Sequence, residues 1–289
     1  MNSSDTLSPK LAAFRPDLAD ARLKGRVQAE AYVDGQQASI RIALADLRRQ
    51  ADDKAPLDSQ LMQSEQVLVF ERKDGWAWVQ CQTDGYVGYI GENNLGPALT
   101  TAATHRVSVL RTPLFTAPDI KSPVRNYLSL QTPLHVRESD GRFLLLETGG
   151  WVYARHADTI DSCATDWTAT ALSFLGTPYL WGGRSSLGLD CSALVQLSLA
   201  AAGLEVPRDS DQQEEAPDLG DRLYPGEDFQ RGDLLYWPGH VAIALGPDSV
   251  VNATAAPLQV IVETFRELDE RARSDGGPLR TIRRPTILS

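Results

Sequence analysis

Cysteine is scarce in this chain, and its scarcity excludes two kinds of stabilised domain. Of the 289 residues, three are cysteines, Cys81, Cys163 and Cys191, and no two of them form a CxxC pair. An odd and sparse set of this kind indicates neither a disulfide framework nor a cysteine zinc site. We therefore expect these cysteines to be free thiols.

Long apolar runs and an export signal are also lacking. The first 25 residues contain no basic start followed by an apolar core, and no later stretch reaches the roughly 18 apolar residues of a membrane span. From the sequence as written we expect a cytoplasmic protein without a membrane partner.

Basic residues are fewer than acidic ones: the chain has 28 lysines and arginines and 38 aspartates and glutamates, which give a formal net charge of -10. Such a balance argues against nucleic acid and other polyanionic partners, and it favours a small or mixed-charge ligand. The glycine-rich "GGRSSLG" lacks the Lys-Ser/Thr ending of a phosphate loop, and no histidine has a neighbour at metal-ligand spacing. We expect no metal and no nucleotide cofactor. The sequence does not indicate the oligomeric state.

What the chain does contain is a repeated pattern of short apolar runs and turns. Asp74-Gly75 separates two such runs in one block, and Asp140-Gly141 does so in the next. Apolar runs with Asp-Gly between them are typical of antiparallel hairpins, so the blocks predict two small SH3-like barrels in tandem. The expected division is an amino-terminal arm, two barrels and a third domain, at residues 1–39, 40–98, 99–160 and 161–289.

The pattern of the third domain changes to helices followed by strands. Thr165 or Asp166 is a candidate N-cap for a first helix, and a second helix begins at Cys191 and stops at Gly203. The remainder alternates apolar residues with turns and predicts a meander of antiparallel strands. The chain as a whole is thus predicted to be multidomain, with two all-β barrels followed by an α+β domain.

Cys191 stands directly after a loop rich in glycine and serine, at the first position of the second predicted helix. Unpaired N–H groups and the positive end of the helix dipole lower a thiol pKa and favour thiolate at such a place. This position suits a nucleophile, although a buried, inert cysteine is the alternative.

His240 is the histidine best placed to act as a base for this thiol. It follows a Pro-Gly turn and begins an apolar strand, and a hairpin centred on Gly246 would bring Asn252 opposite it on the same face. A cysteine, a histidine and an amide in this relation can act as nucleophile, base and orienting group. Surface or satisfied core roles are expected for the other histidines, His105, His135 and His156.

At these residues the third domain resembles the NlpC-type cysteine peptidases, a papain-like family. The matching strings are "GTPYLWGG", "GLDCSALVQ", "VPRDSDQQ", "RGDLLYW" and "GHVAIAL". The family's third catalytic position is more often histidine, whereas here "VVNATA" offers Asn252. With two SH3-like barrels in front, the chain looks like the γ-D-glutamyl-L-diamino acid endopeptidases that cut murein peptides.

The resemblance implies a role for each matched residue. Cys191 would attack the γ-glutamyl carbonyl, His240 would move the proton, Asn252 would hold the imidazole, and Tyr179 would help to hold the oxyanion. An acidic pocket would bind the substrate's amino group. Its members would be Asp190, Ser192, Asp209 and Ser210, with Trp181 as a wall, and with Glu65 and Tyr86 reaching in from the first barrel.

Several alternatives stay open at this level. Asp190 would also serve as a helix N-cap, Asp209 and Ser210 as a turn, Trp181 as core packing, and Tyr89 could take the place of Tyr86.

The resemblance implies a cofactor-independent thiol hydrolase that cuts after γ-D-glutamate in peptides with a free amino-terminal L-alanine, and so recycles released wall fragments. The diamino acid, meso-diaminopimelate or lysine, is left open, as is the preference for tripeptides or tetrapeptides. One alternative is a wall-acting endopeptidase or amidase whose barrels bind polymeric peptidoglycan. The other is an inert peptide-binding scaffold.

Overall fold

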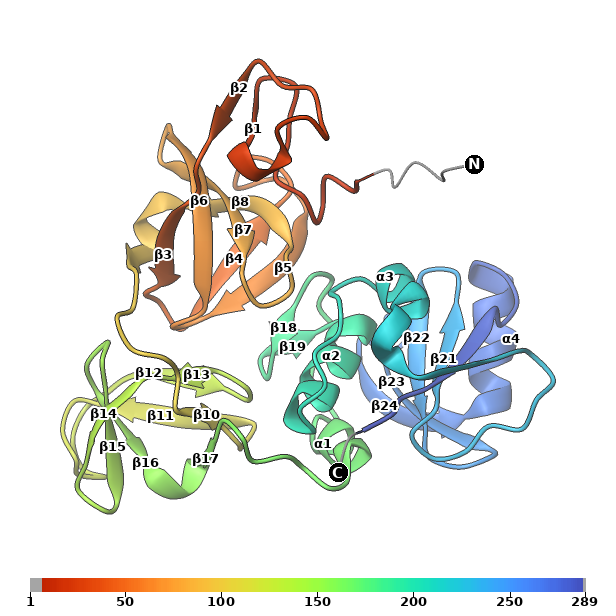
Figure 1. Ribbon diagram of the computed structural model, residues 1–289. Coiled ribbons are helices and arrows are strands. Elements are labelled where there is room, and N and C mark those ends of the chain that lie inside the picture. The colour runs from red at the N-terminus through yellow and green to blue at the C-terminus, as the bar shows by residue number, and fades with distance from the viewer. Residues whose placement is uncertain (1–6, 288–289) are drawn as a thin grey trace. The chain divides into compact units, whose positions relative to one another are not determined.

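The computed structural model describes residues 7–287 of the chain, which form two compact units (Figure 1). The first contains the described residues up to His105, together with Pro113–Leu128 and Thr132–Ala154. The second contains Arg106–Thr112, Ser129–Gln131 and the chain from Arg155 onward. Within residues 7–287, no helix is long and apolar enough to cross a membrane.

The first barrel is an antiparallel sheet of seven strands in the order β5-β4-β8-β7-β6-β3-β9. Its hairpin between β6 and β7 turns at Asp74-Gly75, where both residues have positive φ, as a two-residue type I′ turn requires. Alternate residues of β3, β4, β6 and β7 enter one apolar core, to which β5, β8 and β9 each add one residue. The strands are β3 (Gln36–Ile40), β4 (Leu44–Arg48), β5 (Leu57–Met62), β6 (Gln66–Lys73), β7 (Trp76–Cys81), β8 (Val87–Gly91) and β9 (Leu95–Pro97).

The boundary that we expected at residue 40 falls on the last residue of β3, so the barrel begins earlier, at Gln36. Gln36 and Gln37 are both exposed, and no apolar alternation in the sequence marks the start of this strand.

The segment before the barrel is mostly extended and packs on it, in line with the predicted arm. Two of its short pieces, β1 (Leu18–Asp20) and β2 (Ala31–Val33), pair in parallel. The Arg15 guanidinium lies 4.3 Å from the centre of the Trp78 ring and donates a 2.8 Å hydrogen bond to Glu71.

Residues 105–159 supply a second set of short strands, within the predicted limits of the second barrel. Five of them form a sheet in the order β12-β11-β16-β15-β14. The expected turn at Asp140-Gly141 is present, with Gly141 at a φ of 88°. The strands are β10 (His105–Val107), β11 (Arg111–Phe115), β12 (Val124–Ser129), β13 (Pro133–Leu134), β14 (Val136–Ser139), β15 (Phe143–Leu146), β16 (Trp151–Tyr153) and β17 (Ala157–Thr159).

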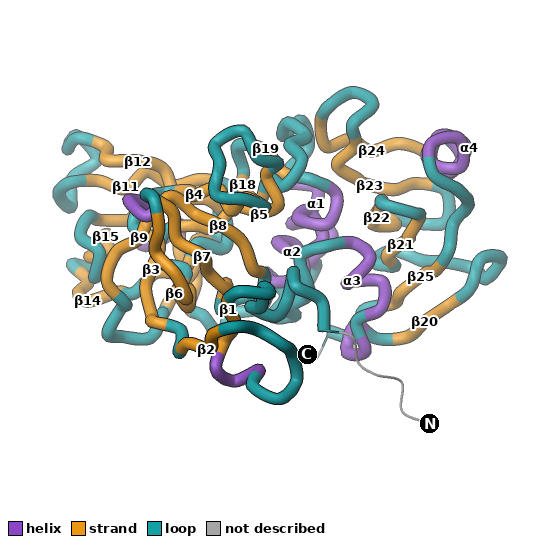
Figure 2. The backbone as a smooth tube through the Cα atoms, turned by 90° about the horizontal axis from the view of Figure 1, so that it is seen from above, coloured by secondary structure: helices purple, strands orange, loops and turns teal. Residues whose placement is uncertain are grey.

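An antiparallel sheet of six strands, β20-β25-β21-β22-β23-β24, organises the second unit. Helix α2 packs against β22 and β23, and α4 covers the opposite face (Figures 1 and 2). The elements are α1 (Trp167–Ser173), β18 (Arg184–Ser185), β19 (Gly188–Leu189), α2 (Cys191–Ala201), α3 (Ser210–Glu215), β20 (Asp221–Leu223), β21 (Leu234–Trp237), β22 (His240–Ala244), β23 (Ser249–Thr254), β24 (Gln259–Thr264), α4 (Phe265–Asp275) and β25 (Thr281–Arg284). Single 3-10 turns occur at η1 (Ala21–Leu23), η2 (Glu92–Asn94), η3 (Ala154–His156) and η4 (Pro217–Leu219).

Both helices expected in this unit are present with the predicted ends. Asp166, one of the two candidates, is the N-cap of α1, and its carboxylate accepts from the backbone N–H groups of Thr168 and Ala169. Helix α2 begins at Cys191, and Gly203 follows its end in the left-handed region, with a φ of 81°.

The predicted meander of strands is wrong in two respects. Helix α4 follows β24, and β25 returns to pair with β21 and β20. A sequence signal for α4 exists, because Thr264 and Glu267 form a capping box, with the Thr264 hydroxyl accepting from the Glu267 backbone and the Glu267 carboxylate accepting in return. The return of β25 has no local signal, since pairing partners far apart in the chain are chosen by tertiary packing.

Gly220 gives a test of this architecture. Its φ of 105° and ψ of -157° suit glycine alone, and an added Cβ would lie 2.1 Å from the carbonyl oxygen of Arg284. We expect Gly220→Ala to lower the free energy of unfolding by about 1–3 kcal/mol in urea titrations. Gly246→Ala is the control, since nothing lies within 4 Å of its Cβ position. Equal effects of the two substitutions would contradict this role for Gly220.

Candidate active site

Cys191 is the first residue of α2 and is 6% exposed. Asp190 is the N-cap, and its side chain accepts from the backbone N–H of Ala193. The backbone N–H groups of Val241 and Ser192 hydrogen-bond the Cys191 sulfur. The thiol of α2 therefore lies against the start of β22, next to His240.

The thiol is not activated in the way that its helix position suggested. Burial raises the pKa of Cys191 to about 12, and the neighbouring Asp190 carboxylate contributes to the rise. The N–H groups on the sulfur and the Arg208 guanidinium act in the opposite direction without offsetting it. Our expectation of a lowered pKa is wrong, because burial and an adjacent negative charge outweigh the end of the helix. Cys191 is a protonated thiol at neutral pH.

His240 begins β22 and is held by Asn252, as predicted. The His240 Nε2 and Asn252 Oδ1 atoms are 3.1 Å apart. The hairpin register differs from the expected one, since the pairs Ile243–Val251 and Ala244–Val250 put Asn252 opposite Ala242. A shift of two residues keeps the same face, so Asn252 meets the imidazole diagonally.

A carboxylate that the sequence did not reveal fixes the orientation of the Asn252 amide. Asn252 Nδ2 donates a 2.8 Å hydrogen bond to Glu263 in β24, so its oxygen must face His240. His240 therefore donates through Nε2–H, and its Nδ1 is left as the proton acceptor. Arg271 of α4 holds Glu263 in turn, through two hydrogen bonds of 2.6 and 2.8 Å.

The imidazole is held in its neutral form. Burial lowers the pKa of His240 to about 4, the hydrogen bond to Asn252 and the charge of Glu263 oppose this change, and the positive charge of Arg271 adds to it. At neutral pH the site therefore holds an uncharged thiol beside an uncharged imidazole.

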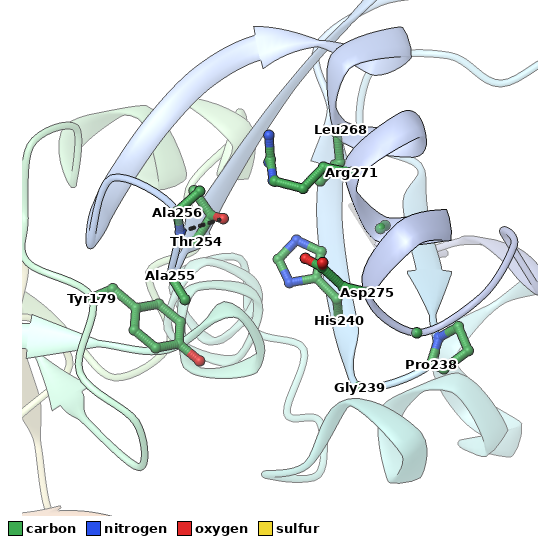
Figure 3. Close-up of a pocket in the computed structure, with 12 residues that line it drawn as sticks. Tyr179, Pro238, Gly239, His240, Thr254, Ala255, Ala256, Leu268, Arg271 and Asp275 are labelled. Carbon is green, nitrogen blue, oxygen red and sulfur yellow. Dashed lines mark hydrogen bonds between the residues drawn. The ribbon is translucent and has the colours of Figure 1, made fainter.

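Tyr179 and His240 line one pocket of about 400 Å³, in which Tyr179 faces the imidazole from across the opening (Figure 3). Burial raises the pKa of Tyr179, and the negative charge of Asp190 adds to the rise. The phenol therefore keeps its proton and can donate a hydrogen bond to a developing oxyanion.

The Asp190 carboxylate is occupied by protein groups. It accepts from five donors: the backbone N–H groups of Gly182 and Ala193, the Ser192 hydroxyl, and both terminal nitrogens of Arg208. A carboxylate offers about four lone-pair sites, and these protein donors occupy them. Asp190 and Ser192 thus act as a helix cap and as partners of Arg208, and their direct contact with substrate stays a prediction.

The remaining predicted residues of this unit lie at its surface or at a helix start. Trp181 is 63% exposed, which rules out the core role and leaves it available as a wall. Asp209 is the N-cap of α3 in a capping box with Gln212, and Ser210 is the first residue of that helix.

Glu65 and Tyr86 belong to the first unit and are both buried there. Glu65 accepts hydrogen bonds from the Met62 backbone and the Thr83 hydroxyl, and Tyr86 is part of the apolar core of the barrel. Tyr89 lies outside this core, and its hydroxyl accepts a 2.9 Å hydrogen bond from Arg15. The contribution of these residues to substrate binding stays a prediction.

The other histidines have structural partners, as expected. The Nδ1 atom of His105 contacts the Thr104 hydroxyl, that of His135 the Thr101 carbonyl, and that of His156 the Thr112 hydroxyl. Across residues 7–287, no group of three or more His, Cys, Asp and Glu side chains is arranged to hold a metal ion.

Titration of His240 tests the charges around it. We expect NMR of labelled histidine to give a pKa near 4 for His240. Glu263→Gln removes a negative charge and should lower this pKa further, whereas Arg271→Gln removes a positive charge and should raise it. Shifts of the same sign in both variants would contradict the network.

Parts of the chain are similar in sequence to known proteins. Residues 176–270 match the NlpC/P60 family, and residues 47–95 match the bacterial dipeptidyl-peptidase SH3 domain. A dipeptidyl-peptidase 6 from Lysinibacillus sphaericus is 39% identical over 106 residues, which are 37% of this chain and 38% of that protein. A γ-D-glutamyl-L-lysine dipeptidyl-peptidase from Bacillus subtilis (strain 168) is 25% identical over 233 residues, 73% of this chain and 77% of that protein.

The fold is also found in a solved structure. The crystal structure of an NlpC/P60 family protein from Bacillus cereus ATCC 10987 has a TM-score of 0.74 at 21% identity and covers 86% of this chain and 99% of that chain. The predicted fold class is confirmed: the chain is a peptidase-type hydrolase that carries an NlpC/P60 cysteine-peptidase domain behind an SH3-like all-β region.

Proposed function

We propose that the protein is a γ-D-glutamyl-L-diamino acid endopeptidase acting on murein peptides with a free amino-terminal L-alanine. The observation that carries the proposal is the placement of the Cys191 thiol beside the start of β22, where Asn252 holds His240 with Nδ1 available. The names of the relatives support the same bond.

The reaction follows from these groups. Nδ1 of His240 takes the thiol proton as the Cys191 sulfur attacks the γ-glutamyl carbonyl carbon, and the oxyanion accepts from the Tyr179 hydroxyl and the Cys191 backbone N–H. The carbon–nitrogen bond then breaks, and His240 gives its proton to the leaving amine. Water attacks the resulting thioester with His240 again as the base, which releases the glutamyl carboxylate and restores the thiol.

Selection of the amino end is part of the proposal. Asp209 and Ser210 would meet the ammonium of L-alanine, with Trp181 beside them. A buried ammonium without a partner is costly, so a peptide blocked at its amino end should be rejected.

We place this activity in the cytoplasm, in the recycling of released wall peptides. The net charge of -10 supports a small soluble substrate over an anionic polymer.

Mass spectrometry of the products tests the activity. We expect the protein to release L-Ala-D-Glu from L-Ala-γ-D-Glu-meso-diaminopimelate, and we expect Cys191→Ala to lower the rate by on the order of 10⁴-fold or more. The matched control is the N-acetylated peptide, which should stay intact. Equal cleavage of the acetylated peptide would favour a wall-acting enzyme, and no cleavage of either would favour a binding scaffold.

Asn252 allows a separate test of the orienting role. Asn252→Ala should lower kcat about 10²-fold with little change in KM, because the imidazole loses its hydrogen-bonded orientation. Asn252→His should retain more activity, since a second imidazole can accept from His240 while donating to Glu263. Equal losses in the two variants, measured by steady-state kinetics, would argue against an orienting hydrogen bond.

A further inference from the structure

A pocket of the second unit lies beside His240. Its lining includes Tyr179, His240 and Thr254 and extends along α4 to Asp275 (Figure 3). All of these residues belong to the second unit. None of the residues proposed for the L-alanine side lines this pocket: Asp190, Ser192, Trp181, Asp209 and Ser210.

The chemistry of the reaction assigns this pocket to the other half of the substrate. His240 gives a proton to the leaving amine, so the residue that bears this amine must lie within reach of the imidazole. Because the pocket is shared by His240 and Tyr179 and is separate from the amino-end residues, it is the place for the diamino acid.

Two opposite charges on α4 face this space. Arg271 and Asp275 are four residues apart and therefore share one side of the helix. Asp275 is exposed and has no hydrogen bond or ion pair with any residue that the structure describes. Arg271 uses two of its five N–H groups on Glu263, and its side chain is 29% exposed.

The rest of the lining is small or apolar. Ala255, Ala256, Leu268 and Ala272 contribute methyl and methylene surface between the charged groups and the catalytic residues. A short hydrocarbon chain that ends in charged groups fits such a lining, because the apolar atoms pack on alanine and leucine while the end remains polar.

We propose that this pocket binds the side chain of the diamino acid and prefers an end that carries both an ammonium and a carboxylate, with Asp275 receiving the ammonium and Arg271 the carboxylate. The assignment rests on the proposed endopeptidase activity. A diaminopimelate side chain supplies both charges on one carbon. A lysine side chain supplies only the ammonium, leaves the remaining Arg271 donors unmatched, and is the weaker substrate.

The test compares kcat/KM for L-Ala-γ-D-Glu-meso-diaminopimelate and L-Ala-γ-D-Glu-L-lysine. The wild type should prefer the diaminopimelate peptide about tenfold, the range of a charge-assisted hydrogen bond. Arg271→Gln should bring this preference to within about twofold of unity, since the carboxylate loses its partner. Any loss that is common to both peptides reports the weakened support of Glu263 and cancels in the ratio.

Asp275→Asn supplies the second arm. It should lower kcat/KM about threefold for both peptides, because both present an ammonium to an exposed carboxylate. Arg266→Gln and Glu270→Gln are the matched controls, since this exposed pair lies on α4 outside the pocket and should leave both values unchanged.

The outcomes separate the two proposals. Cleavage of both peptides with a ratio that Arg271→Gln does not change overturns the pocket assignment alone. A wild type that cleaves neither peptide, while folded by circular dichroism, overturns the proposed activity and the assignment with it.

Discussion

The buried ion pair between Arg208 and Asp190 is the interaction on which the site depends. The Arg208 side chain is 1% exposed and binds both oxygens of Asp190, and it also reaches the Ser192 hydroxyl and the Gly183 carbonyl. It thereby joins the glycine-rich loop, the start of α2 and the segment before α3. These contacts fix the position of Cys191 at the start of the helix. Removing either partner of such a pair leaves a buried charge uncompensated, at a cost of about 3–5 kcal/mol.

The His240 imidazole is held by an equally specific arrangement on the other face of the sheet. Glu263 accepts from Asn252 and from Arg271, so one carboxylate both orients the amide behind His240 and couples β24 to α4. Burial keeps the thiol protonated and the imidazole neutral. A neutral pair avoids the cost of two buried charges, and in the proposed mechanism charge would separate only when a substrate carbonyl and its oxyanion donors are in place.

The sequence allowed much of this to be predicted because several signals are local. A cysteine at a helix start, a Pro-Gly turn before His240 and Asp-Gly turns between strands each act over a few residues. Helix α4 and the return of β25 were not predicted, although the capping box of α4 is visible in the sequence. The hairpin register was displaced by two residues, yet the period of two along a strand still put Asn252 on the correct face.

By itself, the sequence determined the fold class, the position of Cys191 at a helix start and the pairing of His240 with Asn252, because these follow from motifs and from periodicity within neighbouring elements. Tertiary structure alone decided the hydrogen-bond partners and the pKa of each group. Arg208 takes up the carboxylate of Asp190, Glu263 and Arg271 stand behind Asn252, and burial raises the pKa of Cys191 where its helix position predicted a fall. Desolvation and charge pairing depend on which side chains from distant parts of the chain come into contact, and the spacing of residues along the sequence does not predict these contacts.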